Sequence, residues 1–138
     1  HGPAIVENYR RRFRPSEHLS EPKVNIAVQT LCAETEQQAL RLAASRNLLR
    51  LRIVTGRFGG VPPIEEALSY PYLPQESAYL AQVAQTTVDG DPSQVREKLE
   101  AIAELYQTDD LSIVTICYDF ADRVRSYELV AEACAINA

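Results

Sequence analysis

Two segments of the chain carry the apolar pattern of buried strands. In Val24–Cys32 the side chains alternate, so that Val24, Ile26, Val28 and Thr30 share one face and Asn25, Ala27, Gln29 and Leu31 the other. Leu111–Cys117 is almost continuously apolar, which is typical of a strand covered on both faces. A helical pattern follows each segment, and a strand that leads directly into a helix is the repeating unit of parallel α/β proteins.

Helix signals divide the rest of the chain into about five segments. The helical patterns cover Ala4–Arg14, residues 35 to 54, residues 75 to 85, residues 92 to 106 and the segment that starts at Phe120. Thr35 and Asp91 are predicted to be N-caps, Pro92 suits a first helical position, and Gly56 is expected to end the helix before it. These signals predict an α/β chain with about two parallel strands and several helices.

The stretch from Gly56 to Gln75 is the longest without a periodic pattern, and it is rich in glycine and proline. Long irregular loops in compact domains often serve as lids or line the mouth of a site. A solvated excursion over the surface is an equally good interpretation, and the sequence leaves both open.

Two parallel strands do not complete a sheet. A parallel sheet needs cover on both faces and further strands beside its edges. The chain also contains no methionine, at position 1 or elsewhere. We therefore expect the chain to be the C-terminal end of a larger α/β protein.

Composition and charge exclude several classes of function. The net charge is −5 without a long basic block, which argues against nucleic-acid binding, and the apolar runs are too short to span a membrane. The cysteines Cys32, Cys117 and Cys134 are odd in number and widely spaced, and neither His1 nor His18 has a partner at metal-ligand spacing. We expect reduced, buried thiols in a cytoplasmic protein with no disulfide and no metal site.

Four segments, in order, carry a family resemblance: FRPSEHLSEP, VQTLCAETEQQA, VDGDPSQV and YDFADRVRSYELVAEA. From Tyr9 to Ala133 the chain resembles the C-terminal portion of bacterial luciferase-like flavin-dependent monooxygenases, and among these the alkanal-monooxygenase-like proteins. No single motif is specific, but the ordered set is.

The resemblance implies an incomplete (β/α)8 TIM barrel. Residues 1–138 would be a single C-terminal fragment, Val24–Cys32 its seventh strand, Leu111–Cys117 its eighth, and residues 56–75 an insertion near the active-site mouth. The parent enzyme would bind FMN and use reduced flavin with O2 to oxidise a small organic substrate. The other six strands carry the family's flavin-contacting residues, so no catalytic residue is assigned here. We expect this chain alone to bind no flavin and to be inactive.

The carboxyl ends of parallel strands are where barrel sites form. The candidates at the rim of such a pocket are Gln29, Leu31, Thr115, Cys117, Tyr118 and Asp119. The alternative for three of them is structural, with Asp119 capping the last helix and Thr115 and Cys117 packing in the core.

Two interpretations of the whole chain remain at this point. One is the monooxygenase fragment, whose unpaired strand edges should drive homo-oligomerisation or domain swapping. The other is a free-standing, non-catalytic α/β module for ligand binding or interaction.

Overall fold

The centre of the molecule is a short, open parallel sheet. The computed structural model describes residues 2–135 of the 138-residue chain. Its strands are β1 (Ile26–Cys32), β2 (Val88–Gly90) and β3 (Leu111–Val114), in the order β2-β1-β3. Both outer strands run parallel to β1, and β3 pairs with its first half while β2 pairs with its last three residues. The architecture confirms the α/β class, with parallel strands in an open sheet.

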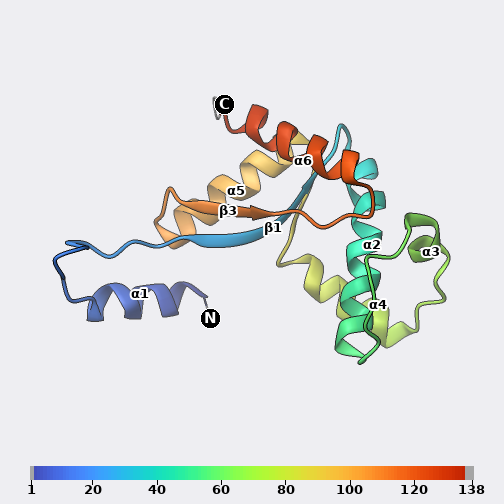
Figure 1. The fold of residues 1–138 in the computed structure, drawn as a ribbon, viewed down its shortest axis with the longest axis horizontal. Helices are drawn as coiled ribbons and strands as arrows, with labels where there is room; N and C mark the ends of the chain where they lie inside the picture. The colour runs from blue at the N-terminus through green and yellow to red at the C-terminus, as the bar shows by residue number, and fades with distance from the viewer. Residues whose placement is uncertain (1, 136–138) are drawn as a thin grey trace.

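Six helices surround this sheet in the described part of the chain (Figure 1). They are α1 (Gly2–Arg12), α2 (Glu36–Val54), α3 (Ile64–Ser69), α4 (Pro74–Ala84), α5 (Pro92–Tyr106) and α6 (Phe120–Ala133). Helices α5 and α6 pack on one face of β1, whereas α2 lies at its carboxyl end and contacts both α3 and α4.

The alternation in β1 decides which helices cover which face. Val28 and Cys32 point into a cluster with Val95 and Leu99 of α5 and Leu129 and Val130 of α6. Leu31 points the other way, into a second cluster that α2 closes with Ala39 and Leu42. A strand presents successive side chains to opposite faces, so the two-faced pattern in the sequence corresponds to two separate cores.

The predicted N-caps Thr35 and Asp91 and the predicted helix end at Gly56 are confirmed, whereas the first helix, predicted over Ala4–Arg14, spans Gly2–Arg12. Thr35 Oγ1 accepts a hydrogen bond from the backbone N–H of Gln38 at 3.2 Å. Asp91 forms a full capping box with Gln94, with Pro92 in the first turn. Gly56 follows α2 with a φ of +74°, the left-handed conformation that glycine adopts without a steric penalty.

The last strand is shorter than predicted. The expected strand reached Cys117, but β3 ends at Val114. Beyond it, the Thr115 hydroxyl donates to the carbonyl of Thr30 at 3.0 Å, and the Thr115 N–H donates to the Tyr127 hydroxyl at 3.2 Å. Side-chain hydrogen bonds thus replace the ladder while the segment stays extended and partly buried.

Two elements escaped prediction. Helix α3 lies inside the stretch 56–75, which was expected to be irregular, and β2 was not anticipated. A three-residue strand is too short to show periodicity in the sequence. Strand β2 forms through its parallel pairing with the last three residues of β1. Helix α3 is held on α2 by Ala67, which packs with Leu48 and Leu51, and by the ion pair between Arg41 and Glu65.

Helix α1 lies apart from the sheet, at the end of a long connecting segment (Figure 1). Arg10 links it to α5, since its guanidinium donates to the carbonyls of Tyr106 at 2.8 Å and Gln107 at 2.6 Å. These carbonyls close the C-terminal end of α5, where a cation is favourable because the helix dipole is negative there.

Candidate functional site

A pocket of about 350 Å³ opens beside Gln29, in the middle of β1, on the face away from α5 and α6. It lies between β1, the segment just after β3, the second half of α2 and Tyr79 of α4. Its lining residues are Gln29, Arg46, Leu49, Arg50, Ile53, Val54, Tyr79 and Ile116. We call it the α2 pocket. One lining residue, Ile116, lies just past the carboxyl end of β3, and carboxyl ends of parallel strands are the usual position of sites in α/β proteins.

Arg46 forms a buried ion pair behind this pocket. Its guanidinium donates to the two carboxylate oxygens of Asp89 at 2.8 and 2.7 Å. The two side chains are only 4% and 10% exposed. The Thr87 hydroxyl donates to the same carboxylate at 3.0 Å. The pair ties α2 to β2, and the charge of Arg46 is neutralised inside the protein.

Arg50 lies one helical turn later on the same side of α2, and its environment differs. It donates one hydrogen bond, from Nη2 to Gln29 Oε1 at 2.5 Å. No carboxylate of the described residues lies within 4 Å of it. Arg50 is half-buried, so the pocket carries one positive charge without an internal counter-ion.

Of the six residues predicted for the pocket rim, Gln29 is the one that lines the α2 pocket. Leu31 is fully buried beneath α2, and Thr115 and Cys117 are buried in the core. Asp119 is the N-cap of α6, where its carboxylate accepts the Ala121 N–H at 2.7 Å. Tyr118 is 53% exposed at the surface.

Sequence reasoning missed the residues that give the pocket its character. Arg46 and Arg50 are four positions apart on a helix, so they share a face. The stripe beside them is otherwise apolar, with Leu42 and Leu49 at neighbouring turns. Two arginines four positions apart on an otherwise apolar helix face can be recognised in a sequence, and they indicate charged groups at a buried or half-buried site.

The thiols are packing residues. Burial raises the pKa of Cys32 to about 11, with the negative charges of Asp91 and Glu34 adding to the effect. Burial also raises the pKa of Cys117 and of Cys134 above the ordinary value for a thiol. A nucleophilic cysteine needs a lowered pKa, so the environments of these three side chains do not suit nucleophilic catalysis.

Residues 2–135 contain no cluster of three or more histidine, cysteine or acidic side chains suited to a metal ion. His1 lies outside the described residues, and His18 contacts Glu17 at the surface. No helix in that same range is long and apolar enough to cross a bilayer.

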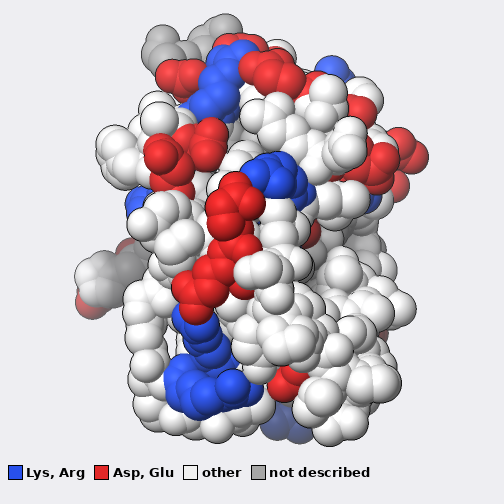
Figure 2. Space-filling view, turned by 90° about the vertical axis from the view of Figure 1, so that its right-hand side faces the viewer, with Lys and Arg blue, Asp and Glu red and all other residues white. Residues whose placement is uncertain are grey.

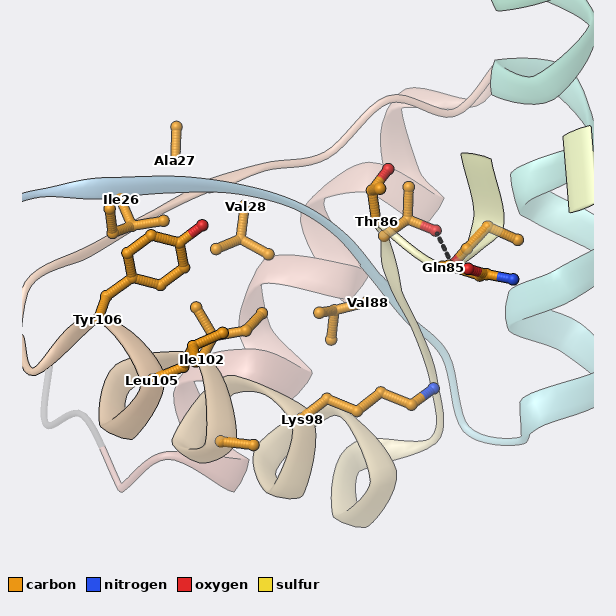
Figure 3. A pocket seen from close by; sticks show the side chains of 13 residues that line it. Ile26, Ala27, Val28, Gln85, Thr86, Val88, Lys98, Ile102, Leu105 and Tyr106 are labelled. Carbon is orange, nitrogen blue, oxygen red and sulfur yellow. Dashed lines mark hydrogen bonds between the residues drawn. The ribbon is translucent and has the colours of Figure 1, made fainter. Parts of the chain in front are cut away.

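A second, larger hollow of about 580 Å³ runs along the edge of β1, between that strand and α5. Ile26, Val28, Ile102 and Tyr106 turn their side chains toward it (Figure 3). Strand β2 pairs with β1 only from Thr30 onward, so this stretch of the edge has no strand beside it in the described structure. We call this hollow the edge groove.

The side of the molecule formed by α2, α3 and α4 carries paired charges. Figure 2 shows basic and acidic side chains alternating down the middle of this face, beside a broad uncharged area. Arg41 pairs with Glu65 and Arg52 with Glu66, and both pairs join α2 to α3. These charges are compensated among themselves, unlike that of Arg50.

Known proteins resemble this chain over nearly its whole length. The uncharacterized protein YwcH of Bacillus subtilis (strain 168) is 36% identical over 138 residues, which cover 97% of this chain and 40% of YwcH. A luciferase-like monooxygenase of Escherichia coli (strain K12) is 24% identical over 124 residues, which cover 90% of this chain and 37% of that enzyme. The chain is thus similar in sequence to proteins that include luciferase-like monooxygenases.

The crystal structure of apo-MsnO8 agrees in fold. It superposes with a TM-score of 0.84 at 28% sequence identity and covers 98% of this chain, which in turn covers 41% of MsnO8. No protein-family model matches the chain. The chain therefore spans about two fifths of the length of the proteins it resembles.

Proposed function

We propose that this chain forms part of a luciferase-like, flavin-dependent monooxygenase, in which reduced FMN and O2 oxidise a small organic substrate. The observation that carries the proposal is the relationship to luciferase-like monooxygenases along nearly the whole chain, combined with a sheet that stops after three strands. An enzyme of this kind places its site at the carboxyl ends of the strands, and the α2 pocket reaches Ile116, just past the carboxyl end of β3.

The edge groove supports the idea that further strands belong to the site. Beside Ile26 and Val28 the backbone of β1 has a free edge, and the groove presents apolar side chains next to it. We propose that a parallel strand from the rest of a longer protein pairs along this edge. An added strand would satisfy the backbone groups and bury the apolar lining.

The described residues do not fit FMN by themselves. A flavin phosphate is commonly held by backbone N–H groups of a glycine-rich turn at a helix N-terminus. Here Gly59 and Gly60 lie in an exposed loop, with no atom within 4 Å of the position that a Cβ would take. We therefore expect residues 1–138 alone to bind no flavin stoichiometrically and to show no monooxygenase activity.

Within the longer enzyme, this chain would shape one wall of the site. Gln29 and Arg50 would supply the polar groups, and Ile116 would supply apolar surface that excludes water. The redox chemistry would come from the flavin.

A chimera tests the proposal. In the Bacillus subtilis relative YwcH, the matching segment is replaced by this chain, and FMN binding is measured by flavin fluorescence for the chimera and for unmodified YwcH. We expect both proteins to bind FMN, and the isolated chain to bind none. The proposal would be refuted if the folded chimera failed to bind FMN while unmodified YwcH bound it.

Light scattering on the isolated chain separates the proposal from a free-standing module. Free edges on β1 and β3 should drive self-association or domain swapping, so we expect assemblies larger than one chain. A monodisperse, cooperatively folded monomer at micromolar concentration would favour the free-standing, non-catalytic module instead.

A further inference from the structure

We infer that the α2 pocket binds the carboxylate of a small organic molecule with an apolar body, and that Arg50 is the residue that anchors it. The designation of this molecule as the substrate rests on the proposed monooxygenase function. Binding to the pocket does not, because each residue that carries the inference is present in this chain.

The contrast between Arg46 and Arg50 is the first step. Both arginines line the same pocket, one turn apart on α2. Arg46 forms a bidentate ion pair with Asp89. Among the described residues, Arg50 has only the neutral amide of Gln29 as a partner. A half-buried guanidinium loses part of its hydration, and this desolvation costs free energy when no counter-ion is near. A bound anion would offset that desolvation cost.

Unused donors point to an oxyanion as that ligand. A guanidinium has five N–H donors in a planar fork that matches a carboxylate, and Arg50 uses one of them. Gln29 accepts that bond through Oε1, so its amide nitrogen keeps both of its own donors. Arg46 Nε adds a buried N–H without a hydrogen-bond partner in the described structure.

The rest of the lining selects an apolar body. Leu49, Ile53, Val54 and Ile116 form the walls. Ile53 and Val54 are 49% and 57% exposed at the end of α2, which is high for large aliphatic side chains beside a pocket. One cation set against aliphatic walls suits a molecule with a charged end and an apolar remainder. A volume of about 350 Å³ suits a small molecule rather than a peptide.

The test uses the 138-residue chain and a matched pair of probes. 3-Phenylpropionate carries the carboxylate, and 3-phenylpropanamide has nearly the same shape without the charge. Binding is followed by NMR through the side-chain amide signals of Gln29 and by calorimetry. We expect saturable shifts of the Gln29 signals with the acid, and binding of the amide at least about tenfold weaker, the loss expected for one charge-assisted hydrogen bond.

Variants locate the anchor. Arg50→Gln should weaken binding of 3-phenylpropionate about tenfold or more. Arg123→Gln removes an exposed arginine from α6 outside the pocket and should leave binding unchanged. Equal loss in both variants would show a general charge effect and overturn the inference. Unchanged binding in Arg50→Gln, or equal binding of acid and amide, would do the same.

Two further probes identify the source of the oxyanion. Inorganic phosphate and FMN are titrated into the same samples. Weaker binding of both than of 3-phenylpropionate supports a carboxylate ligand. Tighter, Arg50-dependent binding of FMN would overturn it and assign the pocket to a phosphate. The chimera measurement stays independent, because it reports FMN binding and not carboxylate binding.

Discussion

Replacing Asp89 by asparagine should destabilise the chain far more than its single ion pair would suggest. The substitution keeps the shape of the side chain but leaves the guanidinium of Arg46 buried without a counter-ion. Arg46 and Asp89 are 4% and 10% exposed, and two hydrogen bonds of 2.8 and 2.7 Å join them. Breaking a buried pair by removing one partner costs about 3–5 kcal/mol, because the remaining charge stays desolvated.

The free energy of unfolding is measured by urea titration followed by circular dichroism. Arg41→Gln is the control, since Arg41 and Glu65 form an exposed pair with 50% and 78% exposed side chains. An exposed pair of this kind contributes about 1 kcal/mol or less. A thermal scan should show the same order, with the midpoint of Asp89→Asn lower by roughly 10 °C or more.

A double replacement separates the two explanations for such a loss. If the cost arises from an orphaned charge, Arg46→Met combined with Asp89→Leu should be much more stable than Asp89→Asn alone, because an apolar pair needs no compensation. The reasoning would be refuted if Asp89→Asn cost no more than Arg41→Gln. A double variant as unstable as the sum of its single changes would also refute it.

Three further predictions concern the core. Ser126→Ala should cost about 1–3 kcal/mol in urea unfolding, because the buried Cys32 N–H loses the Ser126 hydroxyl that accepts its hydrogen bond at 2.9 Å. A cost below a few tenths of a kcal/mol would contradict this. Leu48→Ala should lower the free energy of unfolding by about 2–5 kcal/mol, because Leu48 is fully buried. Leu40→Ala, on the exposed side of α2, should lower it by under about 1 kcal/mol. Equal losses in the two variants would disprove the assigned core face of α2. The pKa of Cys32 rises from 9.0 to about 11 on folding, so the fold favours the thiol, and stability should fall as the pH rises from about 9 to 11. Cys32→Ala should flatten that fall when unfolding is measured across this range, and an unchanged slope would show that other groups cause it.

The local features of the fold could be predicted because they depend on residues a few positions apart. Asp91 caps α5 through N–H groups two and three residues away, and Gly56 ends α2 through its own backbone freedom. The alternation of β1 anticipated which of its side chains share a face, for the same reason. The surroundings of the candidate rim residues could not be predicted in this way, since the position of a residue near a strand end does not say whether a helix will cover it, as α2 covers Leu31.

What the sequence alone determined here is the class of the fold, the helix ends and the two faces of β1, because propensity, capping and periodicity act within a few residues. Tertiary structure decided the site. Arg46 meets Asp89 across 43 positions of the chain, Arg50 meets Gln29 across 21, and Thr115 binds Thr30 across 85. These partners are chosen by how the strand, helix and loop pack, so that Arg46 is neutralised by Asp89 while Arg50 has no carboxylate partner among the described residues.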